Sequence, residues 1–359
     1  MRKKLLLSVL AIVATTTFAQ QMKDSDTHSP YIAGVDEYMP APGQFVNLSP
    51  RYEEGDDAAA MAAKCSAKIA DNRQGIVTLG AFGGYITFHF DHSIANIAGQ
   101  PDLYIMGNAF QAVGTDIAGG SSEPGVVMIS KDVNRNGMPD DAWYEIAGSI
   151  DRDSVGRSIF GYEVTYIKSP MQDIPWTDNQ GESGVVGRNV FHEQEYFPLW
   201  LGSSLTLKGT LLPKNAIYEN GEGKRWIQLF FDYGYVDNKP NQDTLACSID
   251  IDWAVDPVSR DTVHIDFVDF VRVYSGQQQM CGMLGETSTE ICGAEDLHLE
   301  ASIQAIKDAL VQLSVTEKET RNIVETARFT LDGQRITTPQ KGINVVKMCD
   351  GRVRKVIVR

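Results

Sequence analysis

Basic residues are scarce in this sequence. It holds 32 Lys and Arg residues against 47 Asp and Glu residues, and its formal net charge is −15 at pH 7. Nucleic-acid binding needs basic patches that pair with phosphates. The acidic balance therefore argues against nucleic-acid partners and is compatible with the binding of cations or neutral ligands.

Long apolar runs are missing after the first twenty residues. Residues 1–19, "MRKKLLLSVLAIVATTTFA", combine a basic start, an apolar run from Leu5 to Ala14 and a small-residue end at Ala19. This is the pattern of a secretory signal peptide, and its apolar run is too short for a permanent membrane anchor. We expect an exported protein without a transmembrane segment.

The common catalytic motifs are also missing. "FHEQEY" has Tyr196 where an HExxH zinc motif needs its second His, and no GxSxG, phosphate-binding or dinucleotide-binding motif occurs. We therefore predict no enzyme. A glycan hydrolase is the alternative, because the separation of two catalytic carboxylates is spatial and sequence does not show it. Asp250 and Asp252 are one such pair, on the same face of an expected strand.

Cysteine is rare, with five residues and no CxxC pair, which argues against a zinc ribbon. Export permits disulfides. Cys281 and Cys292 bracket a short segment and could close it into a loop, but spacing alone does not establish pairing.

Alternation of apolar and polar residues dominates the central part of the chain. "GGYITFHFD" places Ile86, Phe88 and Phe90 on one face of a strand, and "CSIDIDWAV" alternates in the same way. "LTLKGTLL", "RWIQLFFDYGY" and "FVRVY" are further expected strands, and "DDAAAMAAKCSAKIAD" is an expected helix. The pattern predicts an all-β fold, an antiparallel β-sandwich of the jelly-roll kind.

The organisation that we expect has five parts. Leu297, Ile303, Ile306 and Leu310 recur at helical spacing after the strands, and "DG" turns mark short strands near the end of the chain. The parts are a signal peptide (1–19), a flexible leader (20–45), the β-sandwich (46–292), a helical linker (293–326) and a C-terminal β-unit of three strands (327–359).

The stretch "DVNRNGMPDD", residues 132–141, follows the pattern D-x-[DN]-x-[DN]-G of calcium loops. Calcium takes six to eight oxygen ligands, and the glycine permits the tight turn. The predicted ligands are Asp132, Asn134, Asn136, Met138 through its backbone carbonyl, Asp140 and Asp141.

This stretch departs from an EF-hand, because Trp143 stands where the bidentate Glu is needed and the flanks are expected strands. Asp141 or Glu145 would supply the missing carboxylate. Such extracellular sites bind calcium with dissociation constants of about 10⁻⁴ to 10⁻³ M, which predicts a structural ion. The alternative is a polar hairpin with an Asn-Gly turn and no metal.

A second polar cluster lies in "FDYGYVDNKPNQD". It could line a ligand site on a loop, although a solvated loop is the simpler interpretation. The candidate ligand-binding residues are Trp143, Asp232, Tyr233, Tyr235, Asp237 and Asn238.

Two parts of the sequence resemble known families. "LDGQRITTPQKGINVVKMCDGRVRKVIVR" resembles the C-terminal sorting tails of Bacteroidetes proteins exported by the type IX secretion system. "LGAFGGYITFHFD", "PDLYIMGNAF", "SSEPGVVMISKD" and "LGETSTEICGAEDLH" resemble Bacteroidetes cell-surface proteins, some with PKD-type repeats. The resemblance implies a surface-exposed, non-catalytic β-sandwich near outer-membrane nutrient uptake systems, including those for vitamin B12.

These features predict a secreted or cell-surface binding protein. Its calcium-braced sandwich would present loops to an extracellular glycan or a small nutrient ligand, with outer-membrane uptake or secretion machinery as further partners. The alternatives are a glycan-active hydrolase and an accessory protein for corrinoid capture. Without a working sorting tail the location would be periplasmic.

Overall fold

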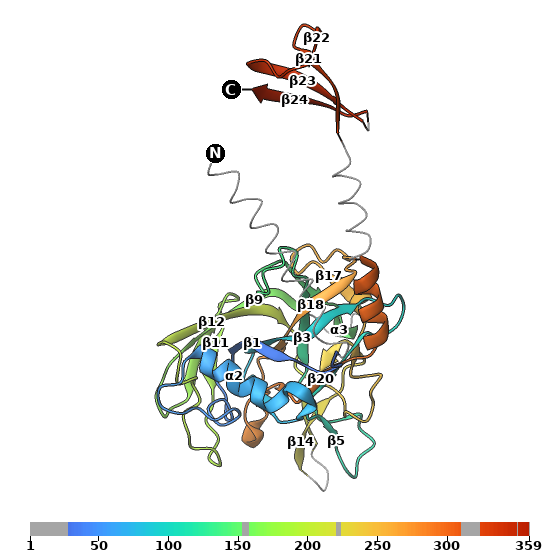
Figure 1. The fold of residues 1–359 in the computed structure, drawn as a ribbon. Coiled ribbons are helices and arrows are strands. Elements are labelled where there is room, and N and C mark those ends of the chain that lie inside the picture. The colour runs from blue at the N-terminus through green and yellow to red at the C-terminus, as the bar shows by residue number, and fades with distance from the viewer. Residues whose placement is uncertain (1–27, 153–157, 220–223, 310–323, 350, 359) are drawn as a thin grey trace. The chain divides into compact units, whose positions relative to one another are not determined.

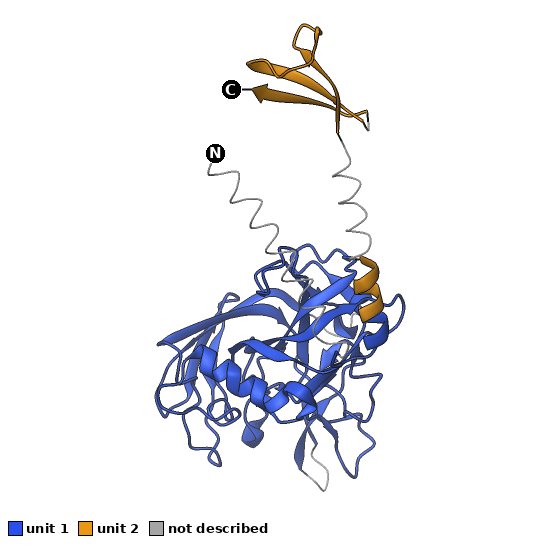
Figure 2. Ribbon diagram, viewed as in Figure 1, with its two compact units in different colours: residues 1–302 blue, residues 303–359 orange. Residues whose placement is uncertain are grey.

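A computed structural model describes residues 28–152, 158–219, 224–309, 324–349 and 351–358. The predicted signal peptide and the first part of the predicted leader lie outside the described residues. The chain divides into two compact units, residues 1–302 and 303–359 (Figure 2). The fold is mostly β, and every strand pairing among the described residues is antiparallel, which confirms the predicted all-β class.

The largest sheet of the first unit has seven strands. Its hydrogen-bonded order is β1–β3–β18–β7–β8–β17, and β15 also pairs with β7. Figure 1 labels β1, β3, β18 and β17 of this sheet. The strands are β1 (Gly34–Met39), β3 (Tyr85–Ala95), β7 (Gly125–Ser130), β8 (Trp143–Ile146), β15 (Tyr235–Val236), β17 (Ala254–Val255) and β18 (Phe267–Ser275).

A four-stranded sheet packs against one face of this large sheet. Its strands are, in spatial order, β11 (Ser183–Val186), β10 (Ile174–Asp178), β9 (Ile159–Ile167) and β12 (Ser204–Leu211). Tyr274 of β18 lies in one apolar core with Val164 of β9 and Leu207 of β12. The neighbouring Val273 belongs to a different core. Because successive side chains of a strand point to opposite faces, the two cores cover the two faces of the large sheet.

Helix α2 (Ala58–Ile69) covers the second face together with smaller elements. Asp57 caps its N-terminus by accepting the Ala60 N–H at 2.9 Å, and Met61, Cys65 and Ile69 are buried. The smaller sheets are β13 (Ala216–Glu219)–β14 (Arg225–Leu229)–β6 (Gly119–Ser121)–β5 (Phe110–Gln111), β16 (Ser248–Ile249)–β4 (Leu103–Met106)–β20 (Gly293–Asp296) and β19 (Glu290–Ile291)–β2 (Val77–Thr78). Short helices are η1 (Ala70–Asn72), α3 (Ser149–Arg152), η2 (Ile251–Trp253) and η3 (Gly282–Leu284).

The second unit contains a four-stranded sheet in the order β22 (Arg335–Ile336), β21 (Glu325–Thr330), β23 (Gly342–Met348), β24 (Val353–Val358). The sequence predicted three strands here, but "RFTLDGQRI" is itself a hairpin. Gly333 makes its turn with a φ of 90°, a backbone conformation that glycine adopts without a steric cost.

The predicted flexible leader, residues 20–45, differs from the structure. Residues 34–39 form strand β1 at the edge of the large sheet, and Tyr38 is only 2% exposed. The Tyr38 hydroxyl donates a hydrogen bond to the Thr78 carbonyl at 2.8 Å. Proline residues on both sides of this short strand obscured its alternating pattern in the sequence.

Two further predictions need correction. "CSIDIDWAV" is not one strand, because Asp250 accepts the Asp252 N–H at 2.8 Å and caps the short helix η2, which separates β16 from β17. The predicted helical linker from 293 begins instead with strand β20, and helical residues run from 299 to 309.

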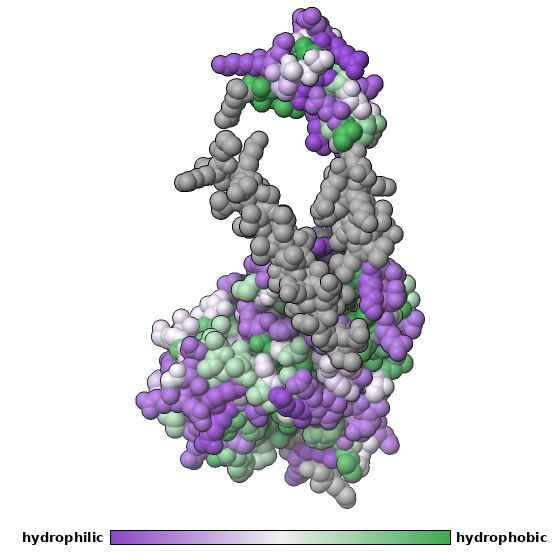
Figure 3. All heavy atoms as spheres, in the orientation of Figure 1, coloured by the Kyte–Doolittle hydropathy of each residue, from purple (hydrophilic) through white to green (hydrophobic). Residues whose placement is uncertain are grey.

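The surface carries no dominant apolar area on the face drawn in Figure 3, where hydrophilic and hydrophobic residues are interspersed. Across the part of the chain that the structure describes, none of the helices combines the length and the apolar character needed to cross a membrane.

Candidate functional site

The loop of residues 131–142 joins β7 to β8 and contains all six predicted calcium ligands. The Asp132 carboxylate accepts the N–H groups of Asn136 at 3.1 Å and Gly137 at 2.8 Å. Gly137 has a φ of 71°, which explains the glycine at this turn. The Asp132 N–H is held by Asp269 of β18 at 2.8 Å, so the loop is fixed to the large sheet.

The side chains of this loop converge on Asp140. Its carboxylate accepts the amide groups of Asn134 at 3.0 Å and Asn136 at 2.9 Å, and these hydrogen bonds lower the pKa of Asp140. Asp141 accepts the Val133 N–H at 2.9 Å. The donor set is rich in oxygen, as calcium requires. The two amides must turn their oxygen atoms inward for an ion to bind.

The structure places two other residues that were considered as calcium ligands, Met138 and Glu145, in different surroundings. The Met138 side chain is exposed, and its carbonyl accepts the Asp140 N–H at 2.9 Å. Glu145, considered as an extra ligand, is only 2% exposed. Its carboxylate contacts Arg260 Nη1 at 2.6 Å and the Tyr274 hydroxyl at 3.0 Å. Glu145 is therefore engaged inside the sandwich and does not serve the loop.

The second predicted cluster separates into buried and exposed residues. Tyr235, Asp237 and Asn238 are 1%, 2% and 0% exposed. Asn238 accepts the Phe231 N–H at 2.7 Å and donates to the Phe231 carbonyl at 2.8 Å, so it holds the loop together. Asp232 is exposed. Of these residues, Asp232 is accessible to a ligand at the surface, whereas Tyr235 and Asn238 are buried and stabilise the fold.

The two remaining aromatic candidates pack against other side chains. The Trp143 ring lies 4.3 Å from the guanidinium carbon of Arg272, on the large sheet. The Tyr233 ring lies 5.0 Å from the Trp253 ring. Neither residue lies with Asp232 in a single site.

A groove of about 660 Å³ lies beside Asp232. Residues of the polar segment 231–243 form one wall, and residues of 111–118 form another. The groove is lined by Gln111, Ala118, Phe230, Asp232, Lys239, Pro240, Gln242 and Asp243. Asn241 pins the polar wall by donating to the Gly107 carbonyl at 2.7 Å and accepting the Gly107 N–H at 3.1 Å. The wall is thus held in place before any ligand binds.

Three carboxyl groups meet behind this wall, and sequence analysis did not bring them together. Ligand atoms of Glu123, Asp237 and Glu290 lie within 4.8 Å of one another. Asp237 accepts the N–H groups of Asn108 at 2.7 Å and Ala109 at 2.8 Å. The three residues are far apart in the chain, so no short sequence motif contains them and sequence analysis could not predict that they meet.

Protons or a cation must balance this group of three carboxyls. Burial, together with repulsion among the carboxylates, raises the pKa values of Asp237 and Glu290 well above their usual range. Burial also raises the pKa of Glu123, to about 7. At neutral pH the group therefore shares bound protons unless a cation takes their place.

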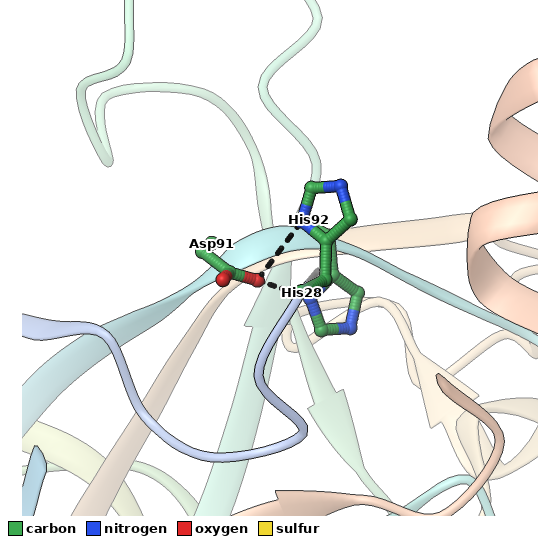
Figure 4. A group of neighbouring side chains, drawn as sticks. All are labelled: His28, Asp91 and His92. Carbon is green, nitrogen blue, oxygen red and sulfur yellow. Dashed lines mark hydrogen bonds and ion pairs between the residues drawn. The ribbon is translucent and has the colours of Figure 1, made fainter. Parts of the chain in front are cut away.

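His92 and His28 both lie beside the Asp91 carboxylate, as Figure 4 shows, and Asp296 lies on the other side of the His92 ring. Its Nδ1 is 2.7 Å from Asp91 and its Nε2 is 2.8 Å from Asp296. His28 contacts the same Asp91 oxygen at 3.3 Å. Since both ring nitrogens of His92 face acceptors, both carry protons, and no lone pair is left for a metal. This group acts as an ion-pair centre that fastens residues 28 and 29 to β3.

The charge of His92 should make stability depend on pH. Burial alone would lower the pKa of His92, but the hydrogen bonds that His92 donates to Asp296 and Asp91 outweigh it and raise the pKa. The stabilisation is complete below the unfolded pKa of about 6.5 and is lost as pH rises through the folded pKa. We expect the stability difference between wild type and His92→Gln to shrink as pH rises from 6 to 9.

Urea unfolding at several pH values measures this difference. His264→Gln is the matched control, since the His264 side chain is 79% exposed. A difference that stays constant with pH would show that His92 is neutral in the folded protein.

The cysteines offer no reactive thiolate among the buried positions. Burial raises the pKa of Cys281 to about 11 and that of Cys292 to about 12. The two form no disulfide: Cys281 lies 3.8 Å from the Thr287 hydroxyl, while Cys292 packs beside Cys247. A nucleophilic cysteine mechanism is therefore unsupported at these positions.

Comparison with known proteins leaves the site to be interpreted from its own geometry. The groove, the 131–142 loop and the three buried carboxyls belong to the first compact unit. No protein-family model matches the chain, and no curated protein matches it.

Proposed function

We propose that this chain is an exported, non-catalytic binding protein whose β-sandwich, braced by calcium, presents a groove to an extracellular glycan or a small nutrient ligand. The groove of about 660 Å³ carries the proposal, because one of its walls is the polar segment predicted as a ligand site. Ligand pockets usually measure about 300 to 1,000 Å³. Export is supported by residues 1–19 and by the sorting-like tail.

The chemistry of the groove suits a hydroxyl-rich ligand. Phe230 offers an apolar ring, and Gln111 and Gln242 offer amides that both donate and accept hydrogen bonds. Asp232 and Asp243 accept hydrogen bonds from hydroxyl groups, and Lys239 donates them. Polar groups held in fixed positions orient a ligand and give a site its specificity.

Binding of soluble oligosaccharides from a defined set tests this proposal. We expect the Asp232→Ala and Gln242→Ala variants to bind at least about tenfold more weakly, equivalent to about 1.4 kcal/mol, because each loses a hydrogen bond in the groove. Calorimetric titration of the full chain gives the dissociation constants. Asp261→Ala, an exposed carboxylate elsewhere, is the control. Unchanged binding in both groove variants would place the ligand site elsewhere.

A hydrolase is the second candidate, because two carboxylates, Asp232 and Asp243, line the same groove. Glycoside hydrolases use such a pair as acid and base or as acid and nucleophile. Release of new reducing ends from a bound oligosaccharide, abolished by Asp243→Asn, would establish the hydrolase and displace the non-catalytic proposal. Binding without release supports the proposal.

Calcium should stabilise the protein through the 131–142 loop. Asp132, Asn134, Asn136 and Asp140 would hold the ion, which draws the loop together between β7 and β8. At 10 mM calcium and a dissociation constant of about 10⁻⁴ to 10⁻³ M, the expected gain is about 1.4 to 2.7 kcal/mol. Thermal melts with calcium and with a chelator measure it.

The Asp132→Ala variant should melt at the same temperature with and without calcium. Asp261→Ala, outside the loop, should keep the wild-type response. A wild-type protein that holds no metal and ignores calcium would show that the loop is a polar hairpin.

A further inference from the structure

A second cavity, of about 160 Å³, lies between the four-stranded sheet and the hairpin of residues 279–287. It is distinct from the groove and shares no lining residue with it. Its lining includes Trp176 of β10, Val186 of β11, Lys214, Gln278, Met280 and Glu286. Its walls are therefore part aromatic, part aliphatic and part polar.

The hairpin places Glu286 in the wall of this cavity. Met280 and Glu286 pair across the hairpin, and the Thr287 N–H donates to the Gln279 carbonyl at 3.0 Å. Residues directly opposite in such a pair have side chains on the same face. Met280 is partly exposed at the cavity, whereas Glu286 is only 3% exposed.

One oxygen of Glu286 has no partner. Oε1 accepts the Gln44 N–H at 2.7 Å, and Oε2 is buried without a hydrogen-bond partner. A buried carboxyl oxygen in this state is costly, unlike one that has a donor or a cation beside it. Lys214 lines the cavity but does not supply that partner. An occupant of the cavity is expected to supply it.

The indole of Trp176 forms the aromatic wall. Gly184 lies directly opposite Trp176 in the β10–β11 pair, and a Cβ atom at Gly184 would approach Trp176 Cζ2 to 2.6 Å. The absence of a side chain at 184 therefore lets the ring lie over β11. The hydroxyl of Tyr166 donates to Gln278 Oε1 at 2.9 Å and fixes this amide in the wall.

We propose that this cavity binds a small organic ammonium ion, with Glu286 as its counter-ion and Trp176 as the ring against which it packs. An indole face attracts cations, the Glu286 carboxylate beside it supplies the counter-charge, and the bound cation becomes the missing partner of Oε2. Val186 and Met280 provide apolar surface for the carbon substituents, which favours an organic cation over a bare metal ion. The site is independent of the proposed groove.

Binding should be coupled to proton release. Burial, with repulsion from Glu123, raises the pKa of Glu286 to about 8. The other ionisable groups nearby are Tyr196, Cys281 and Lys214. An ammonium ion pairs with the carboxylate form, so the acid proton of Glu286 passes to the solvent. The affinity is then expected to rise about tenfold per pH unit between pH 6 and pH 8.

Calorimetric titration of the full chain with tetramethylammonium chloride at pH 6, 7 and 8 tests the proposal. Neopentyl alcohol is the neutral probe of similar shape, and glucose represents a neutral hydroxylated ring. Two buffers with different ionisation enthalpies report the number of protons released. We expect saturable binding of tetramethylammonium only, with about one proton released at pH 7.

Two variants and one control complete the test. Glu286→Gln preserves the shape of the side chain and should weaken binding at least about tenfold. Trp176→Ala should weaken it several-fold, whereas Trp143→Ala, outside the cavity, should leave it unchanged. Equal affinity for neopentyl alcohol, preference for glucose, or no saturable tetramethylammonium binding would each overturn the proposal. If Glu286→Gln does not fold, the Trp176→Ala result and the proton count decide.

Discussion

Replacement of Arg260 by methionine is expected to lower the free energy of unfolding by about 3 to 5 kcal/mol. The Arg260 guanidinium contacts Glu145 at 2.6 Å and Asp151 at 3.0 Å. The side chains of these two acids are only 3% and 8% exposed. Methionine keeps the apolar length of the side chain, so the variant removes mainly the charge. Two buried carboxylates then remain without their cation.

Low pH should reduce this loss. Burial raises the pKa values of both Glu145 and Asp151 even while Arg260 partly offsets it. Without Arg260 these pKa values rise further, so the variant binds protons more readily when folded than when unfolded. Its stability therefore recovers relative to wild type as pH falls from 7 toward 5.

Urea unfolding followed by circular dichroism measures both effects. Arg73→Met is the matched control, because Arg73 and its partner Asp71 are 52% and 66% exposed, and such surface pairs contribute about 0 to 1 kcal/mol. A loss below about 1 kcal/mol for Arg260→Met would contradict the assignment of a buried ion pair. The double variant Arg260→Met with Glu145→Gln should recover part of the loss, since one uncompensated charge disappears.

Alternation of apolar and polar residues predicted which side chains of a strand are buried, but not which strands pair. Ile86 and Phe88 are fully buried, as their alternation with polar residues indicated. Pairing of β3 with β18 joins residues some 180 positions apart, for example Phe88 with Val271, and nothing in either strand specifies that partner. The sandwich class followed from alternation, whereas the strand order did not.

The candidate site residues show the same contrast between features set by neighbouring residues and features set by residues far apart in the sequence. The 131–142 loop was predicted as a calcium site because its oxygen donors lie within ten residues of sequence, and that assignment stays a prediction. Glu123, Asp237 and Glu290 escaped notice because three separate elements bring them together, and only Asp237 was singled out, for a different reason. Glu286 lies in a run of polar residues that reads as a loop, yet its neighbours Thr287 and Ser288 are also buried. Burial of polar residues depends on tertiary packing, which no short motif records.

The carboxyls of half-buried Glu123 and buried Asp237 and Glu290 should make the protein less stable as pH rises from about 4.5 to 7. In the folded protein the pKa of Glu123 is about 7, whereas a free glutamate has a pKa near 4.5. Between these values the folded state binds more protons than the unfolded state, so the free energy of unfolding falls with rising pH. Asp237 and Glu290, whose pKa values burial and repulsion also raise, act in the same direction.

Glu123→Gln should flatten this dependence. The amide oxygen can still accept the Ser288 N–H, which lies 3.0 Å from Glu123 Oε1, and the amide carries no charge that repels Asp237 and Glu290. At pH 8 the variant should therefore be more stable than wild type, and at pH 4.5 the two should be nearly equal. Glu300→Gln, at an exposed position, should follow the wild-type curve.

Parallel curves for wild type and Glu123→Gln would refute proton sharing by this group. Divalent cations provide the complementary test at pH 8. The Asp132→Ala variant, with Glu123 unchanged, removes the 131–142 loop as a calcium site. If magnesium or calcium raises the free energy of unfolding of this variant at pH 8, the three carboxyls themselves bind the ion. If the ions have no effect in that background, protons alone balance the group, and the pH dependence follows from burial of the carboxyls behind the groove wall.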